Sequence, residues 1–453
     1  MAGAKDECDK SKYLKSMQYY KGSKISWWSA TAIVVANMVG TGVFTSLGFQ
    51  LEAIQNTWSI LALWIIGGVV SLFGAFTYAE IGTRLPRSGG EYHFLSNIYH
   101  PFVGYLSGWV SLTVGFSAPI ALAAMAMAAY TSMVVTFITP MQMAVGTILV
   151  LTVVHSFNIR SSSVFQNVAT LFKLVLILAI IILGLNMPNT EHSLDWSAGW
   201  KEEIWLPVYA VALVYVTYSY SGWNAAAYIV EEIKSPAKNL PRALIWGTLV
   251  VSILYVLLQL AFLSQAPLGL LKGQVEVGHI VAEHMFGKHG GNIISVLIAF
   301  FLISGISAMI WVGPRVTRAM ADDYAIWRFL AKDNKDGIPI FAIWLQTGIS
   351  VFMIITGSFK EVLLYSGFVL QIFTALTVAG LFVLRKREPK KGAYQSPLYP
   401  YIQIIYLVIS IWILAYLMYD QPRESLLGLV NVGIGVVSYF WSMRYAAMNS
   451  YNE

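Results

Sequence analysis

Two short runs of small residues interrupt long apolar segments of this chain. The first is Asn37-Met38-Val39-Gly40-Thr41-Gly42-Val43-Phe44, and the second is Tyr218-Ser219-Tyr220-Ser221-Gly222-Trp223-Asn224. Glycine in a helix interior is about 1 kcal/mol less favourable than alanine, so we expect a helix to break at each run. A break leaves backbone N–H and C=O groups without helical partners, and these groups can bind a ligand.

The freed backbone groups predict the chemistry of that ligand. Free N–H groups and the positive end of the helix dipole attract an anion where a half-helix begins, and free carbonyls attract a cation where the preceding half-helix ends. A small zwitterion satisfies both, so an α-amino acid is the expected ligand. We expect Thr41, Gly42 and Val43 to present N–H groups to its carboxylate. Carbonyls near Met38 and Tyr218 would accept its ammonium group.

The composition places both runs inside a membrane protein. The 453 residues are 57% hydrophobic and 11% charged, whereas soluble chains carry about 25% charged residues. So few charges cannot cover a water-facing surface of this size, which excludes cytosolic enzymes, nucleic-acid binders and secreted scaffolds. The net charge of +6 therefore indicates no nucleic-acid partner. The single cysteine, Cys8, excludes an internal disulfide.

Long apolar segments recur along the whole chain. A membrane-spanning helix needs about 20 mostly apolar residues, and we identify twelve candidate spans. They lie at roughly 26–50, 57–82, 100–130, 141–157, 163–185, 204–231, 241–266, 291–322, 339–357, 361–385, 399–419 and 425–445. The sequence therefore predicts an all-α polytopic membrane protein with twelve transmembrane helices.

The two runs fall in the first and sixth spans, which begin two five-span units. Discontinuous helices at corresponding positions of two repeats are the best sequence indication of a transporter's midplane site. Close helix packing around small residues is the alternative, and the matched positions favour a binding site. Because each unit has an odd number of spans, the units are inverted. We expect a tail at 1–24, a core at 25–385 with repeats at about 25–185 and 204–385, and two further helices with the C-terminus at 386–453.

The basic residues predict the orientation of the chain, because Lys and Arg are enriched in cytoplasmic loops. Most of the 29 lie in the N-terminal tail or in connectors on the same side of the membrane as that tail. Only five lie on the opposite side, namely Lys201, Lys272, Lys288, Lys360 and Arg423. We therefore expect a multi-pass protein of the plasma or inner membrane with both termini in the cytoplasm.

Lys173 is the one basic residue that falls deep within a span. It lies ten residues after Ser163, or about 15 Å at 1.5 Å per residue, near the middle of a membrane core about 30 Å thick. A mid-membrane lysine is unfavourable by roughly 2.5–3.5 kcal/mol, so we expect it to face the bundle interior. A structural lysine bonded to carbonyls of the broken first helix is one interpretation, and it overlaps with a functional role. Glu80 ends the second span and is expected to reach the interface.

The connector Gly269–Gly290 has a mixed apolar pattern that fits a short amphipathic helix on the surface. Its residues His279, Glu283 and His284 do not match a zinc-protease motif, so we expect a solvated loop. The seven histidines of the chain show no pairing. No metal, no cofactor and no enzyme active site are therefore expected.

Four motifs resemble those of the amino acid–polyamine–organocation (APC) transporters. In chain order they are Gly40-Thr41-Gly42-Val43-Phe44, Pro86-Arg87-Ser88-Gly89-Gly90-Glu91-Tyr92, Tyr220-Ser221-Gly222-Trp223-Asn224 followed by Glu231-Glu232, and Asn239-Leu240-Pro241-Arg242. Within this superfamily the chain is most similar to the L-type amino acid transporter branch, over nearly its whole length. The resemblance implies the leucine-transporter fold, in which two inverted five-helix repeats are followed by two added helices.

The resemblance also implies roles for individual residues. Thr41, Gly42, Ser219 and Ser221 match substrate-binding positions, and Tyr218 matches an aromatic gate that closes over the substrate. Lys173 would take the place of a sodium ion and couple the site to opening, as in sodium-independent members. The expected substrate-binding set is Met38, Gly40, Thr41, Gly42, Val43, Tyr218, Ser219, Ser221, Gly222, Trp223 and Asn224.

One departure from this family concerns its partners. Light chains of the animal heteromeric members carry an external cysteine between spans three and four that ties them to a glycoprotein. The corresponding loop, at 134–142, has no cysteine, and the chain has no Asn-x-Ser/Thr sequon. We therefore expect a free-standing transporter of prokaryotic type, without a disulfide-linked heavy chain.

Together these features predict a secondary active transporter that moves neutral L-amino acids by alternating access, without sodium and by exchange. Neutral substrates are expected because no Asp or Glu lies mid-span near either run. A proton-coupled symporter of amino acids, amines or polyamines is the alternative. The non-transporter alternative is an ion channel, which is usually built from symmetric subunits, whereas this chain carries its symmetry internally.

Overall fold

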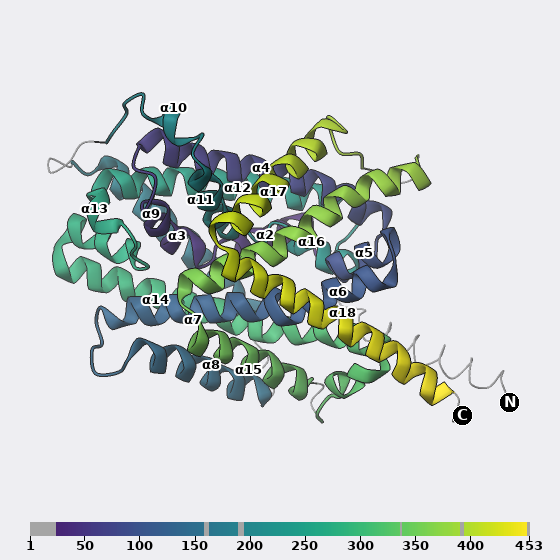
Figure 1. The fold of residues 1–453 in the computed structure, drawn as a ribbon. Coiled ribbons are helices and arrows are strands. Elements are labelled where there is room, and N and C mark those ends of the chain that lie inside the picture. Colours follow the sequence, from purple (N-terminus) through teal and green to yellow (C-terminus); the bar gives the residue numbers. More distant parts are fainter. Residues whose placement is uncertain (1–23, 158–162, 189–193, 336–337, 390–393, 451–453) are drawn as a thin grey trace.

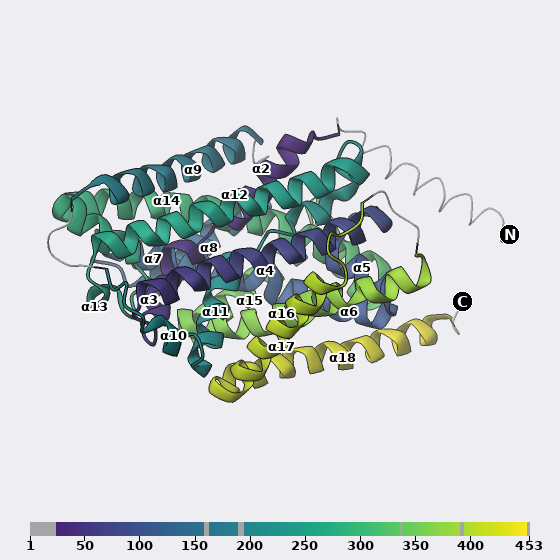
Figure 2. The same cartoon turned by 90° about the horizontal axis from the view of Figure 1, so that it is seen from above.

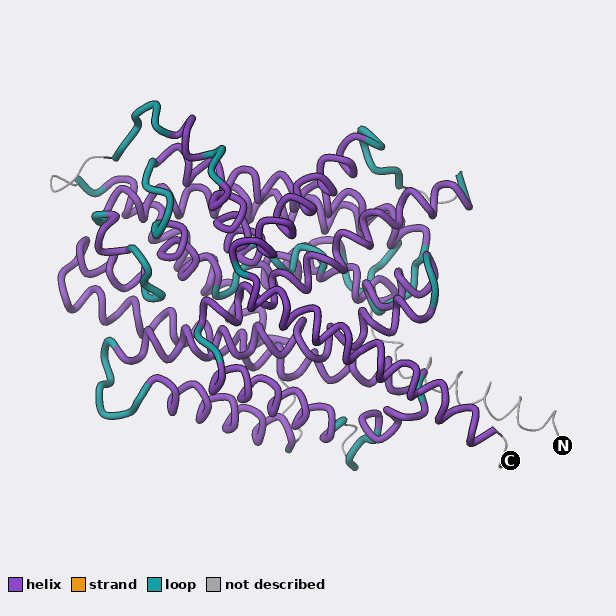
Figure 3. Tube along the Cα trace, viewed as in Figure 1, coloured by secondary structure: helices purple, strands orange, loops and turns teal. Residues whose placement is uncertain are grey.

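The structure, a computed structural model, describes residues 24–157, 163–188, 194–335, 338–389 and 394–450. Within these ranges the backbone is almost entirely helical (Figure 3), and the only strand-like pairing is one bridge between Ile25 and Ile233. The predicted tail at 1–24, which includes Cys8, lies outside the described residues apart from Lys24.

The helices follow the order predicted for the spans. They are α2 (Trp27–Met38), α3 (Gly42–Gln50), α4 (Thr57–Arg84), α5 (Gly90–Ile98), α6 (Pro101–Val110), the π-helical η1 (Ser111–Phe116), α7 (Ser117–Ser132), α8 (Pro140–Ser156), α9 (Ser163–Asn186), α10 (Trp200–Glu203), α11 (Pro207–Ser219), the 3₁₀ helix η2 (Ala225–Glu232), α12 (Pro236–Gln265), α13 (Leu268–Leu271), α14 (Val277–Asp323), the 3₁₀ helix η3 (Ala325–Ala331), α15 (Ile340–Thr356), α16 (Phe359–Arg387), α17 (Tyr401–Asp420) and α18 (Pro422–Ser450).

The described helices account for all twelve predicted spans. Nine helical segments are long and apolar enough to cross a membrane, and α2 with α3 counts as one of them. Three shorter apolar helices, α8, α11 and α15, fall where the fourth, sixth and ninth spans were predicted. The largest difference is at α14, which begins at Val277 rather than near residue 291 and bends at Gly287, whose φ is 71°. The part before this bend is the surface helix predicted in the connector.

The helices on the flanks of the bundle expose large apolar side chains. In Figure 2, α9 lies along one edge and α17 and α18 lie along the opposite edge. Their exposed residues include Leu171 and Ile182 on α9, Val408 and Ile411 on α17, and Val437 and Trp441 on α18. Monomeric soluble proteins rarely expose apolar surface of this extent, so this belt faces lipid.

Helices that are five spans apart in the chain pack against each other. α3 packs on α11, α4 on α12, α7 on α14, and α8 on α15. Helix α12 also packs along α2, and α16 packs on α17 and α18. This pairing brings the predicted breaks of the first and sixth spans together in the middle of the bundle.

The loops gather at the two ends of the bundle. We call the end where α2 begins and α18 ends the terminal face; α5 also lies toward it (Figure 1). We call the opposite end, which carries α10 and α13, the far face. A substrate that crosses the bundle must pass from one of these faces to the other.

Glu80, predicted to reach the interface at the end of its span, is instead buried within the protein. Its side chain is fully buried and pairs with Arg84 at 2.7 Å and with Arg385 at 2.6 Å. It also accepts the backbone N–H of Ser396 at 2.7 Å, while Arg84 donates to the backbone carbonyl of Glu388 at 2.6 Å. This ion cluster joins the ends of α4 and α16 at the terminal face.

Candidate functional site

The first span is broken where its glycines predicted. Helix α2 ends at Met38, Val39 has a non-helical ψ of 86°, and α3 starts at Gly42. Thr41, Gly42 and Val43 are buried, and no described residue accepts a hydrogen bond from their amides. Buried backbone donors without a partner are rare in native proteins. The three amides therefore form a donor set that suits a carboxylate.

The sixth span is broken at the matching position. Helix α11 ends at Ser219, and the chain resumes as a 3₁₀ helix only at Ala225. Gly222 has a φ of +94°, a conformation that glycine adopts without strain. A Cβ atom there would lie 2.8 Å from the carbonyl group of Asn37. Glycine is therefore needed both for the turn and for the close approach to the first span.

The two breaks touch each other through small residues. A Cβ atom on Gly42 would lie 2.5 Å from the Ser219 hydroxyl and 2.6 Å from the Ser219 Cα atom. The hydroxyls of Ser46 and Ser219 are 2.8 Å apart. The structure thus brings the predicted residues of the two runs together, as a single site requires.

The carbonyls expected to receive an ammonium group already accept hydrogen bonds. The Tyr255 hydroxyl donates to the Met38 carbonyl at 2.6 Å, and the Ser221 amide donates to the Tyr218 carbonyl at 2.9 Å. The Tyr218 carbonyl is also a partner of the Tyr220 amide. A carbonyl oxygen has a second lone pair, so the Met38 carbonyl can still accept. The Ser219 carbonyl, which the prediction did not include, accepts no hydrogen bond from a described residue.

Several residues that support the first break were not predicted. The Gln259 amide donates to the Val43 carbonyl at 3.1 Å, and the Tyr130 hydroxyl donates to the Phe44 carbonyl at 2.9 Å. With Tyr255, these residues satisfy carbonyls on both sides of the break. They come from α7 and α12, far away in the chain. A polar residue such as Gln259 within an apolar span was the one available signal.

A buried carboxyl lies beside the second break. Glu91 accepts hydrogen bonds on the same oxygen from the Tyr78 hydroxyl at 2.6 Å and from the Asn224 amide at 3.2 Å. The ring of Trp223 packs edge-on against Tyr78 at 4.7 Å. Glu91 was not predicted as a site residue, because it belongs to α5, which lies between two spans. The burial of Glu91 raises the pKa of its carboxyl, and the hydrogen bonds from Tyr78 and Asn224 oppose this shift only in part.

Backbone contacts close the terminal face around this carboxyl. The Ser88 amide donates to the Glu231 carboxylate, and the Glu231 amide donates to the Ser88 hydroxyl, both at 3.2 Å. The Ile25 amide donates to the Glu232 carbonyl at 2.8 Å, and the Lys234 amide donates to the Ile25 carbonyl at 3.0 Å. Segments 86–90 and 225–234 are thus locked together with the start of the first span.

The far face is closed as well. The Gly273 amide donates to the Gly48 carbonyl at 2.8 Å. The ring of Phe49 stacks on Tyr215 at 5.5 Å and on Phe359 at 5.7 Å. Contacts therefore bridge the bundle on both sides of the breaks. Tyr218, the predicted gate, is only 8% exposed.

Lys173 faces the interior of the bundle, although not through the predicted carbonyl contacts. It is 7% exposed, and its ammonium lies 4.6 Å from the centre of the Phe301 ring. Phe301 packs edge-on against Phe44, just beyond the first break, at 5.5 Å. Among the described residues, Lys173 has no hydrogen-bond or ion-pair partner. It therefore adjoins the broken first span through two aromatic rings.

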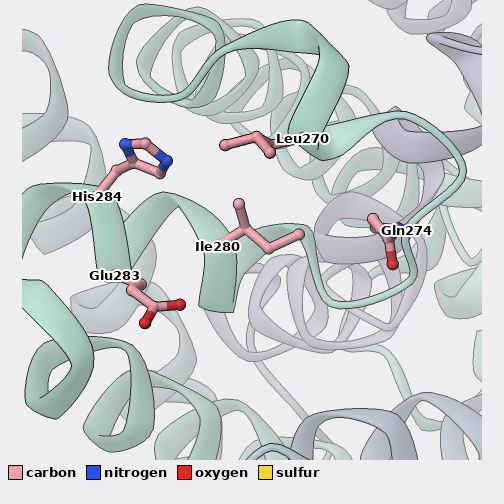
Figure 4. A pocket seen from close by; sticks show the side chains of 5 residues that line it. All are labelled: Leu270, Gln274, Ile280, Glu283 and His284. Carbon is pink, nitrogen blue, oxygen red and sulfur yellow. The ribbon is translucent and has the colours of Figure 1, made fainter. Parts of the chain in front are cut away.

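The histidine-containing connector is less solvated than predicted. His279 is buried, its Nδ1 lies 2.8 Å from the Ser295 hydroxyl, and its Nε2 lies 3.4 Å from Glu283. A hollow at the far face is lined by Leu270, Gln274, Ile280, Glu283 and His284 (Figure 4). No group of three or more potential metal ligands occurs among the described residues.

A comparison with protein families decides what kind of protein contains this site. The sequence model of a family described as amino acid permease matches residues 25–437, which include both breaks, Lys173, the first eleven spans and the first part of the twelfth. The chain belongs to the amino acid permease family. This membership identifies it as an APC-superfamily amino acid transporter with the leucine-transporter fold, and not as an enzyme or a channel.

The relatives of this permease place it in the L-type branch. The serine/threonine exchanger SteT of Bacillus subtilis is 28% identical over 428 residues, which cover 92% of this chain and 95% of the exchanger. The large neutral amino acids transporter small subunit 2 of Rattus norvegicus is 28% identical over 444 residues, covering 94% and 82%. The b(0,+)-type amino acid transporter 1 of Mus musculus is 26% identical over 435 residues, covering 92% and 87%.

The buried carboxyl predicts a pH dependence for this permease. A raised pKa means that the closed terminal face binds a proton at Glu91 more tightly than an open, hydrated one. We therefore expect closing to favour protonation of Glu91, and opening to become easier as the pH rises above the ordinary carboxyl range. We expect amino acid exchange in proteoliposomes to accelerate as the pH at the terminal face rises, and Glu91→Gln to flatten this profile.

The control for this prediction is a second carboxyl at the same face. Glu388→Gln removes a partly exposed carboxyl from the end of α16 and should leave the pH profile unchanged. An unaltered pH profile in Glu91→Gln would show that Glu91 does not link protonation to opening.

Proposed function

We propose that this permease exchanges neutral amino acids across the membrane by alternating access, with the two helix breaks as the substrate site. The observation that carries the proposal is the set of buried amides at Thr41, Gly42 and Val43, which lie beside the end of α11 and have no hydrogen-bond partner among the described residues. They would bind the substrate carboxylate. The carbonyls of Met38, Tyr218 and Ser219 would accept its ammonium group.

The remaining predicted residues surround this pair of charges. Gly42 and Gly222 allow the close approach of the two breaks. Gly40 lies in the first break between α2 and α3, and Ser219 and Ser221 add hydroxyls. Trp223 and Asn224 form the floor toward the terminal face, where Asn224 is bonded to Glu91. Tyr218 would act as the gate over the bound substrate.

Neutral substrates fit this site better than cationic ones. The Glu91 carboxyl group accepts a hydrogen bond from Asn224, which lies in the second break, and another from Tyr78. A cationic side chain would find no other carboxylate within the described breaks. The names of two relatives, a serine/threonine exchanger and a large neutral amino acid transporter, agree with this substrate class.

We also propose that transport needs no sodium, because the Lys173 ammonium occupies the interior beside the first span. Lys173 contacts Phe301, and Phe301 packs on Phe44 next to the first break. These two contacts would couple Lys173 to the break. In the same arrangement, residues about 25–185 and 204–385 would form the two repeats, and 386–453 would form the added helices and the C-terminus. The packing of each span on the span five positions later supports this division.

The terminal face is proposed to be cytoplasmic, in a plasma or inner membrane. The distribution of Lys and Arg supports this orientation. One relative is named as a small subunit, whereas loop 134–142 of this chain has no cysteine. We therefore propose that this permease works without a disulfide-linked heavy chain.

Uptake into proteoliposomes tests the proposal. Radiolabelled neutral amino acids should enter faster when vesicles are preloaded with unlabelled substrate, and replacing sodium with choline should leave the rate unchanged. Collapse of uptake without sodium would exclude the proposed role of Lys173. Uptake that needs no internal substrate but follows an imposed pH gradient would instead establish proton-coupled symport.

A further inference from the structure

A small hollow at the terminal face lies outside the substrate site. It is lined by Ala237, Lys238, Pro241, Arg242, Ile245, Trp246 and Tyr394. All but Tyr394 belong to the first part of α12, and Tyr394 comes from the segment before α17. The hollow therefore lies where one long helix leaves the membrane beside a neighbouring connector.

Two cations, Lys238 and Arg242, line this hollow. Lys238 and Arg242 are exposed and four residues apart on α12, so they lie on one helical face. Neither forms an ion pair with a described residue, and neither donates a side-chain hydrogen bond to one. The nearby Glu231 carboxylate accepts the Ser88 amide, and Glu80 is held by two arginines. Neither of these carboxylates lines the hollow.

The polarity of this face of α12 changes along the helix. Trp246, four residues beyond Arg242, is 53% exposed, and Val250 and Ile253 farther along are 42% and 54% exposed. The helix rise of 1.5 Å per residue puts Trp246 about 12 Å deeper than Lys238. Tryptophan is enriched at the level of lipid headgroups, with apolar side chains below it. The face thus presents cations, then an interfacial aromatic ring, then an apolar path.

We propose that this hollow binds an anionic phospholipid, with the lipid phosphate on Lys238 and Arg242 and the acyl chains along Val250 and Ile253. Basic pockets between helices at the cytoplasmic side of a membrane bind anionic headgroups. The charge and the graded polarity of this face match such a lipid and do not match a soluble anion, which would leave Trp246 unused. The bound lipid would fix the end of α12, the helix whose Tyr255 and Gln259 hold the first break.

Native mass spectrometry of the full-length, delipidated protein with phosphatidylglycerol tests this proposal. We expect the double variant Lys238→Gln/Arg242→Gln to bind phosphatidylglycerol roughly thirty-fold more weakly, because each basic side chain near an anionic surface contributes to attraction. Phosphatidylcholine should bind weakly and equally to all variants. The matched control Lys332→Gln/Lys335→Gln removes two exposed lysines from another loop of the same face and should bind phosphatidylglycerol as the wild type does.

A second variant separates the hollow from its charge. Ala237→Trp should fill the hollow while both cations remain, and it should reduce phosphatidylglycerol binding to a similar extent. Equal binding by the double variant and its control would overturn the proposal. Displacement of the lipid by millimolar inorganic phosphate would also overturn it, because the occupant would then be a soluble anion. The unfolding temperature of each delipidated variant, measured without added lipid, reports folding independently of lipid binding.

Discussion

We expect Gly42→Val to abolish amino acid binding and exchange. Even the first side-chain atom at this position would lie 2.5 Å from the Ser219 hydroxyl and 2.6 Å from the Ser219 Cα atom. The Cα atom cannot move aside as a flexible side chain could, so the two breaks must separate. Displacing a binding group by about 1 Å can reduce activity about a hundredfold. A thermal-shift titration and an exchange assay should both show a loss of at least this size.

The matched control for Gly42 lies on α8. A Cβ atom at Gly146 would meet nothing within 4 Å, so Gly146→Val introduces the same side chain into open space. It should leave binding and exchange near the wild-type level. Retained substrate affinity in Gly42→Val would show that the amides of the first break do not bind the carboxylate.

We expect Glu80→Gln to destabilise the protein by about 3–5 kcal/mol, because removing one partner of a buried ion pair leaves an uncompensated charge. Here one carboxylate serves two arginines, Arg84 and Arg385. The side chain of Arg84 is 1% exposed and that of Arg385 is 19% exposed. Denaturant unfolding in detergent measures the loss. The double variant Glu80→Gln/Arg385→Gln should recover part of it, since one of the two uncompensated charges is then gone.

The matched control for this cluster is an ion pair on the surface. Arg423 pairs with Glu361 at 2.9 Å, and the Arg423 side chain is 72% exposed. Arg423→Gln should lower the free energy of unfolding by about 1 kcal/mol or less, as exposed pairs do. Equal effects of Glu80→Gln and Arg423→Gln would mean that burial of the cluster does not determine its strength.

The sequence predicts the spans and their breaks because both depend on neighbouring residues. An apolar run of sufficient length is a span wherever it lies, and the glycines at 40, 42 and 222 weaken a helix locally. The contact between the two breaks is also expected from the sequence. The two repeats have equal numbers of spans, so the breaks occupy corresponding positions in them. The family match likewise extends over residues 25–437 of the sequence.

The residues that the sequence did not reveal depend on long-range packing. Glu80 looks like an interfacial carboxylate until Arg385, 305 residues away, packs against it. Glu91 lies between two spans, and only the folding of α5 against η2 makes it a neighbour of Asn224. His279 is buried because α14 begins earlier than hydropathy indicates and bends at Gly287. In each case the deciding partner is remote in the chain.

The bridge between Ile25 and the segment after η2 has a mechanical consequence. The Ile25 amide donates to the Glu232 carbonyl, and the Ile25 carbonyl accepts from the Lys234 amide. These two hydrogen bonds connect the start of the first span to the end of the sixth. We therefore expect the two half-helices to move away from α5 together. The contacts of Ser88 with Glu231 and of Glu91 with Asn224 would then break in the same step that opens the terminal face.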